Sequence, residues 1–171
     1  MIATKLGTYS TGGYHFYDTT GIYETWFLES NSVTWKIGPS LLDARAEHAC
    51  GLFTFSNSEV LIVAGGNFEN NKPVLTTELL NLAELDDNNG WQPGPMLPDG
   101  IAMGSGHTIV SNGESLYYIN TFYNEFYELI CLESLTNCTW TQLYDAKLNY
   151  PRHYAVALML PDDMVDMVDC A

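Results

Sequence analysis

Short apolar runs separated by polar turns follow one another along most of this 171-residue chain. The clearest run, residues 60–64, is rich in β-branched side chains and ends at Gly65 and Gly66. A short run bounded by glycines is typical of a strand covered on both faces, rather than of a helix. The flanking pattern predicts a first strand within residues 44–55, a third at 76–82 and a fourth at 91–98.

The same order of strands recurs on both sides of this unit. The matching segments are residues 5–11, 23–28 and 33–39 before it, and residues 106–110, 115–119, 126–132 and 139–143 after it. Each unit closes with a tryptophan, namely Trp35, Trp91 or Trp140. A period of about 50 residues indicates an array of repeated structural units.

Two further features recur in register with the tryptophans. A glycine pair follows the second strand of the first two units, as Gly12-Gly13 and Gly65-Gly66, whereas Asn120-Thr121 takes that place in the third. Basic or imidazole side chains open the units: Arg45 with His48, His107 alone, and Arg152 with His153. Four short strands, a Gly-Gly stop and a closing tryptophan resemble the kelch motif, over about residues 4–160. Kelch repeats build β-propellers with one four-stranded sheet per blade.

The resemblance implies an all-β fold, a kelch-type β-propeller in an incomplete arc of about three four-stranded blades. The units would be a partial blade holding strands two to four (1–43), a complete blade (44–100), a degenerate blade (101–149), the first strand of a further blade or a closing strand (150–161), and an acidic C-terminal tail (162–171). Closed propellers have four to eight blades. We therefore expect a fragment of a larger propeller, with pairing of two copies into one ring as the alternative. An isolated arc would expose apolar blade faces, through which the chain could self-associate.

Composition removes some classes of partner. The chain has 21 acidic and 6 basic residues, for a net charge of −15. Because nucleic-acid binding needs a basic patch, this balance argues against nucleic acid as a partner. A solubilising surface explains the charge, and a basic partner or a cation site is the alternative. The longest apolar run, residues 155–160, is far shorter than the ~20 residues of a membrane helix, so no membrane span is expected.

One predicted hairpin carries two signs of an oxidising compartment. Cys131 and Cys138 flank it, and opposed positions there would bring their Cα atoms within disulfide range. Asn137 opens an Asn-Cys-Thr triplet, which is an N-glycosylation acceptor sequence. Together they favour an extracellular, secreted glycoprotein over a cytoplasmic one, with two free thiols and a chance triplet as the alternative. Whether Cys50 pairs with Cys170 is left open.

The sequence offers no catalytic residues. His48 and His107 hold equivalent repeat positions, which favours a structural role, and no metal-binding spacing of His or Cys occurs. Nucleotide-binding and nucleophile-elbow motifs are also missing. We therefore expect no enzyme, no cofactor and no metal site.

Loops that follow the second strand of each unit are the candidate binding surface. They should gather on one rim and carry Tyr14, Phe16, Tyr17, Phe68, Asn70, Phe122 and Tyr123. Exposed aromatic side chains beside amides suit protein or glycan contacts, although the same residues could simply cap the blade edges. The kelch resemblance implies a non-enzymatic protein–protein interaction module with a partner of unknown identity. The alternative is a carbohydrate-binding or oxidase-like kelch propeller.

Overall fold

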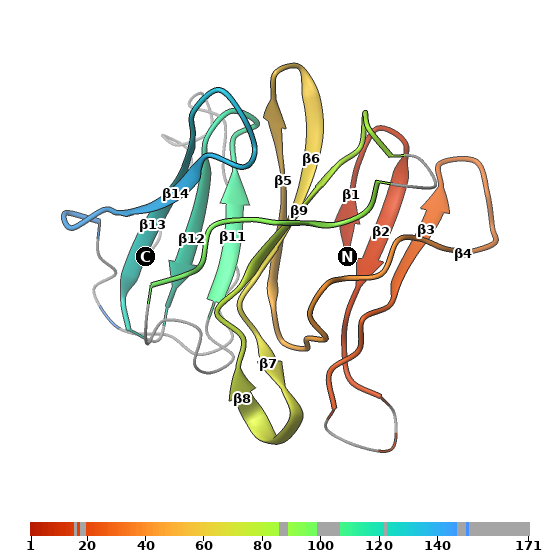
Figure 1. Ribbon diagram of the computed structural model, residues 1–171, viewed down its shortest axis with the longest axis horizontal. Helices are drawn as coiled ribbons and strands as arrows, with labels where there is room; N and C mark the ends of the chain where they lie inside the picture. The colour runs from red at the N-terminus through yellow and green to blue at the C-terminus, as the bar shows by residue number, and fades with distance from the viewer. Residues whose placement is uncertain are drawn as a thin grey trace, which may run out of the picture.

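The computed structural model describes residues 1–15, 17, 20–85, 89–98, 107–121, 123–146 and 150. Within them the protein is all-β, with three four-stranded antiparallel sheets in succession along the chain and one two-stranded ribbon (Figure 1). The only helical element among the described residues is a short 3₁₀ turn, η1 (Glu69–Asn71). No helix of the length and hydropathy needed to span a membrane is found in this part of the chain.

Sheet I contains, in spatial order, β1 (Ile2–Ala3), β2 (Gly7–Thr11), β3 (Thr25–Glu29) and β4 (Lys36–Ile37). The sequence predicted β2, β3 and β4 but began the sheet at its second strand. The structure adds β1, in which Ile2 lies opposite Tyr9. A strand of two residues is too short to produce an alternating pattern, so the sequence alone could not indicate it.

Sheet II contains β5 (Ala49–Phe55), β6 (Ser58–Ala64), β9 (Thr77–Asn81) and β10 (Gln92–Pro93). The ribbon of β7 (Asn67–Phe68) and β8 (Lys72–Pro73) projects between β6 and β9. Sheet III contains β11 (His107–Ser111), β12 (Leu116–Asn120), β13 (Glu125–Cys131) and β14 (Cys138–Gln142). Within each of the three sheets the chain passes from strand to neighbouring strand, as the repeat pattern predicted.

Sheet II is covered on both faces. All five residues of the run Val60–Ala64 have no exposed surface, which confirms the prediction of a fully buried strand. Because side chains alternate along a strand, Val60 and Ile62 pack with sheet III, while Leu61 and Val63 pack with sheet I. The three sheets therefore share two continuous apolar interfaces.

The sheets are arranged with their first strands together, because β5 contacts both β1 and β11. Turns between strands one and two, and between strands three and four, lie at one end of the molecule. The connections between strands two and three lie at the other, so the β7–β8 ribbon and the β13–β14 hairpin are at opposite ends (Figure 1). The described residues form no closed ring. The predicted strand at 150–161 and the tail at 162–171 lie outside them, apart from Tyr150.

The predicted disulfide is present. Cys131 at the end of β13 lies opposite Cys138 at the start of β14, with an S–S distance of 2.04 Å. Cys50 is a free, half-buried thiol, and Cys170 lies outside the described residues.

Candidate functional site

Two of the three motif tryptophans make the same contact between sheets. The indole N–H of Trp91, just before β10, donates to the hydroxyl of Thr25 (3.2 Å) and to the carbonyl of Pro39 (3.1 Å). The indole N–H of Trp140, in β14, donates to the hydroxyl of Thr77 (3.2 Å). Thr25 and Thr77 are each the first residue of the third strand in the preceding sheet. The same Trp–Thr contact therefore occurs at both interfaces, between sheets I and II and between sheets II and III.

One glycine of each pair, Gly12 or Gly66, lies where neighbouring backbone approaches closely. Gly12 and Gly66 have φ angles of +54° and +94°, which L side chains rarely adopt. A Cβ atom on Gly12 would lie 2.5 Å from the Arg45 carbonyl oxygen, and one on Gly66 would lie 2.4 Å from that of Ala46. His48 contributes to both approaches, with its ring beside Gly12 and its Cα and Cβ beside Gly66, and its Nε2 is hydrogen-bonded to the Thr11 hydroxyl at 2.9 Å.

Burial disfavours the charged form of both motif histidines. It lowers the pKa of His48 to about 3, and the positive charge of Arg45 adds to the effect. Burial also lowers the pKa of His107, whose Nε2 lies 2.6 Å from the Glu47 carbonyl oxygen. Among the described residues, no group of three or more His, Cys, Asp or Glu side chains is arranged to hold a metal ion.

A buried ion pair fixes the linker between sheets I and II. The Arg45 guanidinium is fully buried and donates to the Glu78 carboxylate in β9 at 2.6 Å. Glu78 also accepts backbone N–H bonds from Leu42 (2.6 Å) and Asp43 (3.0 Å). Arg45 further donates to the carbonyl oxygens of Gly65 and Thr76, both at 2.9 Å. Burial lowers the pKa of Arg45, and the Glu78 carboxylate opposes that shift.

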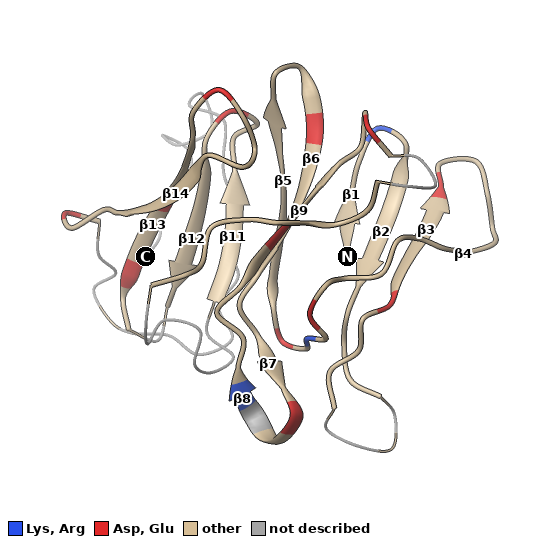
Figure 2. Ribbon diagram, viewed as in Figure 1, with Lys and Arg blue, Asp and Glu red and all other residues tan. Residues whose placement is uncertain are grey.

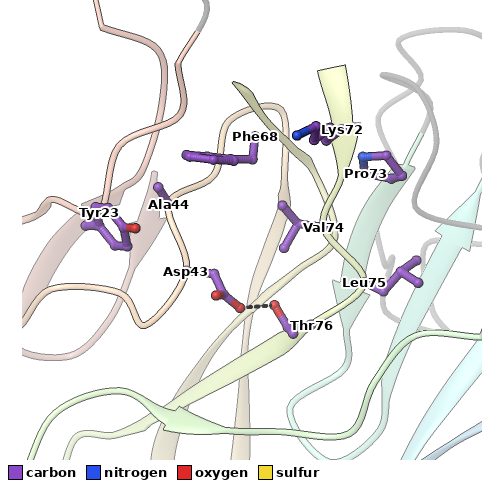
Figure 3. A pocket seen from close by; sticks show the side chains of 9 residues that line it. All are labelled: Tyr23, Asp43, Ala44, Phe68, Lys72, Pro73, Val74, Leu75 and Thr76. Atoms are coloured by element: carbon purple, nitrogen blue, oxygen red, sulfur yellow. Dashed lines mark hydrogen bonds between the residues drawn. The ribbon is translucent and has the colours of Figure 1, made fainter. Parts of the chain in front are cut away.

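A candidate binding site is a pocket of about 370 Å³ beside this ion pair (Figure 3). It lies between the β7–β8 ribbon, the linker that carries Arg45, and the segment leading into β3. The lining residues are Tyr23, Asp43, Ala44, Phe68, Lys72, Pro73, Val74, Leu75 and Thr76. Most of these side chains are apolar or aromatic, and a volume of this size accommodates one large side chain or a small ligand.

The polar part of the pocket is anchored. The Thr76 hydroxyl donates to the Asp43 carboxylate at 2.6 Å, a bond drawn in Figure 3. The same carboxylate lies 3.7 Å from the Arg45 guanidinium, yet the Asp43 side chain remains 49% exposed. Thr76 and Arg45 therefore fix the position of the Asp43 side chain, while part of its carboxylate stays accessible to a ligand. Acidic residues are spread over all three sheets and basic ones are few, with Lys72 on β8 beside the pocket (Figure 2).

The structure brings one of the predicted rim residues, Phe68, into this pocket. Tyr14, Tyr17 and Tyr123 are exposed on connections between second and third strands, but they do not line it. Asn70 is exposed within η1, where its φ of 57° suits an asparagine. Phe16, Phe122 and Arg152 lie outside the described residues.

Sequence reasoning missed the polar residues of the pocket. Asp43 and Thr76 are far apart in the chain, and neither belongs to a recurring motif. One indication was available: Asp43 precedes the motif residue Arg45 by two positions, which places both on one side of an extended chain. No model of a protein family matches this sequence, and no curated protein matches it significantly.

Proposed function

We propose that this chain is a non-enzymatic protein-interaction module built as an arc of kelch-type propeller blades. The blade interpretation is supported by the repeated Trp–Thr contact, by Gly12 and Gly66 at close backbone approaches, and by three successive four-stranded sheets. The interaction role depends above all on one observation, the pocket that is lined by both Phe68 and the anchored Asp43 carboxylate.

The pocket suits a projecting side chain from a protein partner. Tyr23, Phe68 and Val74 offer an apolar wall, and Asp43 offers a partly exposed carboxylate. Such a site takes an aliphatic or aromatic anchor whose polar end reaches the carboxylate. The disulfide supports a partner met outside the cytoplasm, since such bonds persist in oxidising compartments.

Peptide selection tests the proposal even while the partner is unidentified. A displayed library of random peptides would be selected on the full chain, and the affinities of selected peptides measured by calorimetry. We expect Phe68→Ala and Asp43→Ala to weaken binding at least about tenfold, as loss of a central anchor contact does. Leu132→Ala is the control, because this leucine is 60% exposed at the opposite end of the molecule.

The outcomes separate the alternatives. Selected peptides that bind the Phe68→Ala, Asp43→Ala and Leu132→Ala variants with the same affinity as the unmodified chain would refute the pocket as the interaction site. Sugar binding on a glycan array that is lost in the Phe68 and Asp43 variants would instead indicate a carbohydrate-binding propeller. Stoichiometric copper in the purified protein would indicate the oxidase-like alternative.

Self-association through sheet I stays a prediction with its own test. Trp26 and Ile37 lie opposite each other in β3 and β4, and Trp35 is two positions before Ile37, so all three share the face turned away from sheet II. They are 36%, 75% and 37% exposed, respectively. We expect the sedimentation mass to rise with concentration, and Ile37→Glu to reduce that rise. A monomer at all concentrations would contradict the prediction.

A further inference from the structure

We propose that Asn137 is a site of N-linked glycosylation in the β13–β14 hairpin. The full sequence contains one Asn-X-Ser/Thr triplet with X other than proline, Asn137-Cys138-Thr139. Such a triplet is common by chance, so the proposal depends on where the fold places its three side chains.

The fold separates the triplet into two outward side chains and one inward side chain. Cys138 is buried and belongs to the apolar cluster between sheets II and III. Thr139, the next residue of β14, is exposed, as is Asn137 at the end of the hairpin loop. Because side chains alternate along a strand, the Asn137 amide and the Thr139 hydroxyl leave the sheet on the side opposite the core.

The hairpin does not depend on the Asn137 side chain. Its backbone N–H donates to the Ser134 carbonyl (3.1 Å) and its own carbonyl accepts from Leu132 N–H (2.9 Å). These main-chain bonds set the loop, and the disulfide between Cys131 and Cys138 closes its base. A sugar on the side-chain nitrogen would therefore add bulk in solvent without breaking a contact that shapes the hairpin.

The disulfide is an independent observation that points to the same modification. Disulfides form in compartments such as the endoplasmic reticulum, and N-linked oligosaccharides belong to proteins of the same secretory route. The reaction joins Asn137 Nδ2 to C1 of an oligosaccharide carried on a lipid diphosphate. As the N–C1 bond forms, the C1–O bond to the diphosphate breaks, one amide proton passes to a base, and the lipid diphosphate leaves. No oxidant or reductant takes part.

The position of the site is compatible with the proposed interaction function and independent of it. Asn137 lies at the end of the molecule that carries the turns between third and fourth strands, opposite the β7–β8 ribbon and its pocket (Figure 1). An oligosaccharide there leaves the pocket open to a partner. Failure of the pocket proposal would leave this inference intact, and the reverse also holds.

The test is expression of the full chain behind a cleavable secretion signal in animal cells. We expect the intact mass to carry one oligosaccharide that peptide-N-glycosidase removes, and peptide mapping to find aspartate at position 137 after treatment. Asn137→Gln and Thr139→Val should abolish the modification, whereas Thr139→Ser should retain it. These changes affect exposed side chains, so folding should be preserved.

Both secreted and cell-retained protein would be mapped, so that poor secretion does not remove the readout. Unmodified Asn137 in both pools, with the Cys131–Cys138 bond formed in the secreted protein, would overturn the inference. A modification that persists in the Thr139→Val variant would also overturn it, because the triplet would not then be the recognition element.

Discussion

Replacing Trp91 with alanine should destabilise the fold far more than the same change at Trp35, although both occupy the same position in the repeat. Trp91 is 4% exposed, and its indole N–H donates hydrogen bonds to Thr25 and Pro39 across an interface between sheets. Trp35 is 37% exposed on the face of sheet I that is turned away from sheet II. The repeat position is thus constant while the packing environment differs.

The magnitudes follow from this difference. Truncating a buried tryptophan costs about 3–5 kcal/mol. Trp91→Ala should lie near the upper end of this range, because it also removes the hydrogen-bond donor to the Thr25 hydroxyl and the Pro39 carbonyl. Trp35→Ala removes a side chain that is more than a third exposed, so we expect a loss of about 1 kcal/mol. Trp91→Phe retains most of the apolar contact and loses the N–H, for about 1–2 kcal/mol.

Urea unfolding followed by far-ultraviolet circular dichroism is the suitable assay, since tryptophan fluorescence changes with the substitutions themselves. An unchanged m-value would show that the midpoint shift reports stability. Trp91→Phe keeps the test available if the alanine variant does not fold. In a double-mutant cycle we expect Trp91→Phe and Thr25→Val to be coupled by about 1 kcal/mol. Equal losses for Trp91→Ala and Trp35→Ala would refute the reasoning.

Three further predictions concern buried groups. The folded protein keeps His48 neutral down to about pH 3 whereas the unfolded chain protonates it below about pH 6.5, so stability should fall with decreasing pH by up to about 1.4 kcal/mol per unit. Chemical unfolding between pH 7.5 and 5 should show a flatter slope for His48→Gln, and an identical slope would contradict this cause. Glu78→Gln should cost about 3–5 kcal/mol, because it removes the only fully buried counter-ion of Arg45 among the described residues and leaves the half-exposed Asp43 carboxylate 3.7 Å away. A loss below 1 kcal/mol in urea unfolding would show the pair to be dispensable. Replacing Cys131 and Cys138 by serine together should lower stability by about 2–2.5 kcal/mol, the contribution of so short a closed loop. Thermal unfolding of the unmodified chain with and without reductant checks this prediction, and an equal midpoint under both conditions would contradict it.

The inner strands could be predicted because a strand that is buried on both faces requires a continuous apolar run, which is visible in the sequence. Residues 60–64 must be apolar throughout, since sheets pack on both of their faces. The outer strands were predicted too long: 33–39 and 91–98 become Lys36–Ile37 and Gln92–Pro93. The N–H groups of Gly38 and Gly94 still donate to the third strand, but the next residues, Pro39 and Pro95, have no N–H with which to continue the ladder.

The pocket could not be predicted in the same way, because three separate segments form it. The repeat pattern predicts that Phe68 lies on a rim loop, but it does not predict that Tyr23 and Asp43 line the same pocket. The linker that carries Asp43 is bound to β9 through Glu78, which pairs with Arg45 although the two residues are 33 positions apart in the chain. A long-range ion pair leaves no periodic trace in one sequence, whereas a strand does.

The same ion pair separates residues that build the scaffold from residues that can bind a partner. Arg45 and Glu78 are buried and pair with each other, so changing either should reduce stability and deform the pocket together. Phe68 is only partly buried on a projecting ribbon, so its removal should affect binding with little loss of stability. A variant that lost binding only in proportion to its stability would therefore point to the scaffold. Loss of binding at unchanged stability in Phe68→Ala would point to the pocket, and this is the pattern we expect.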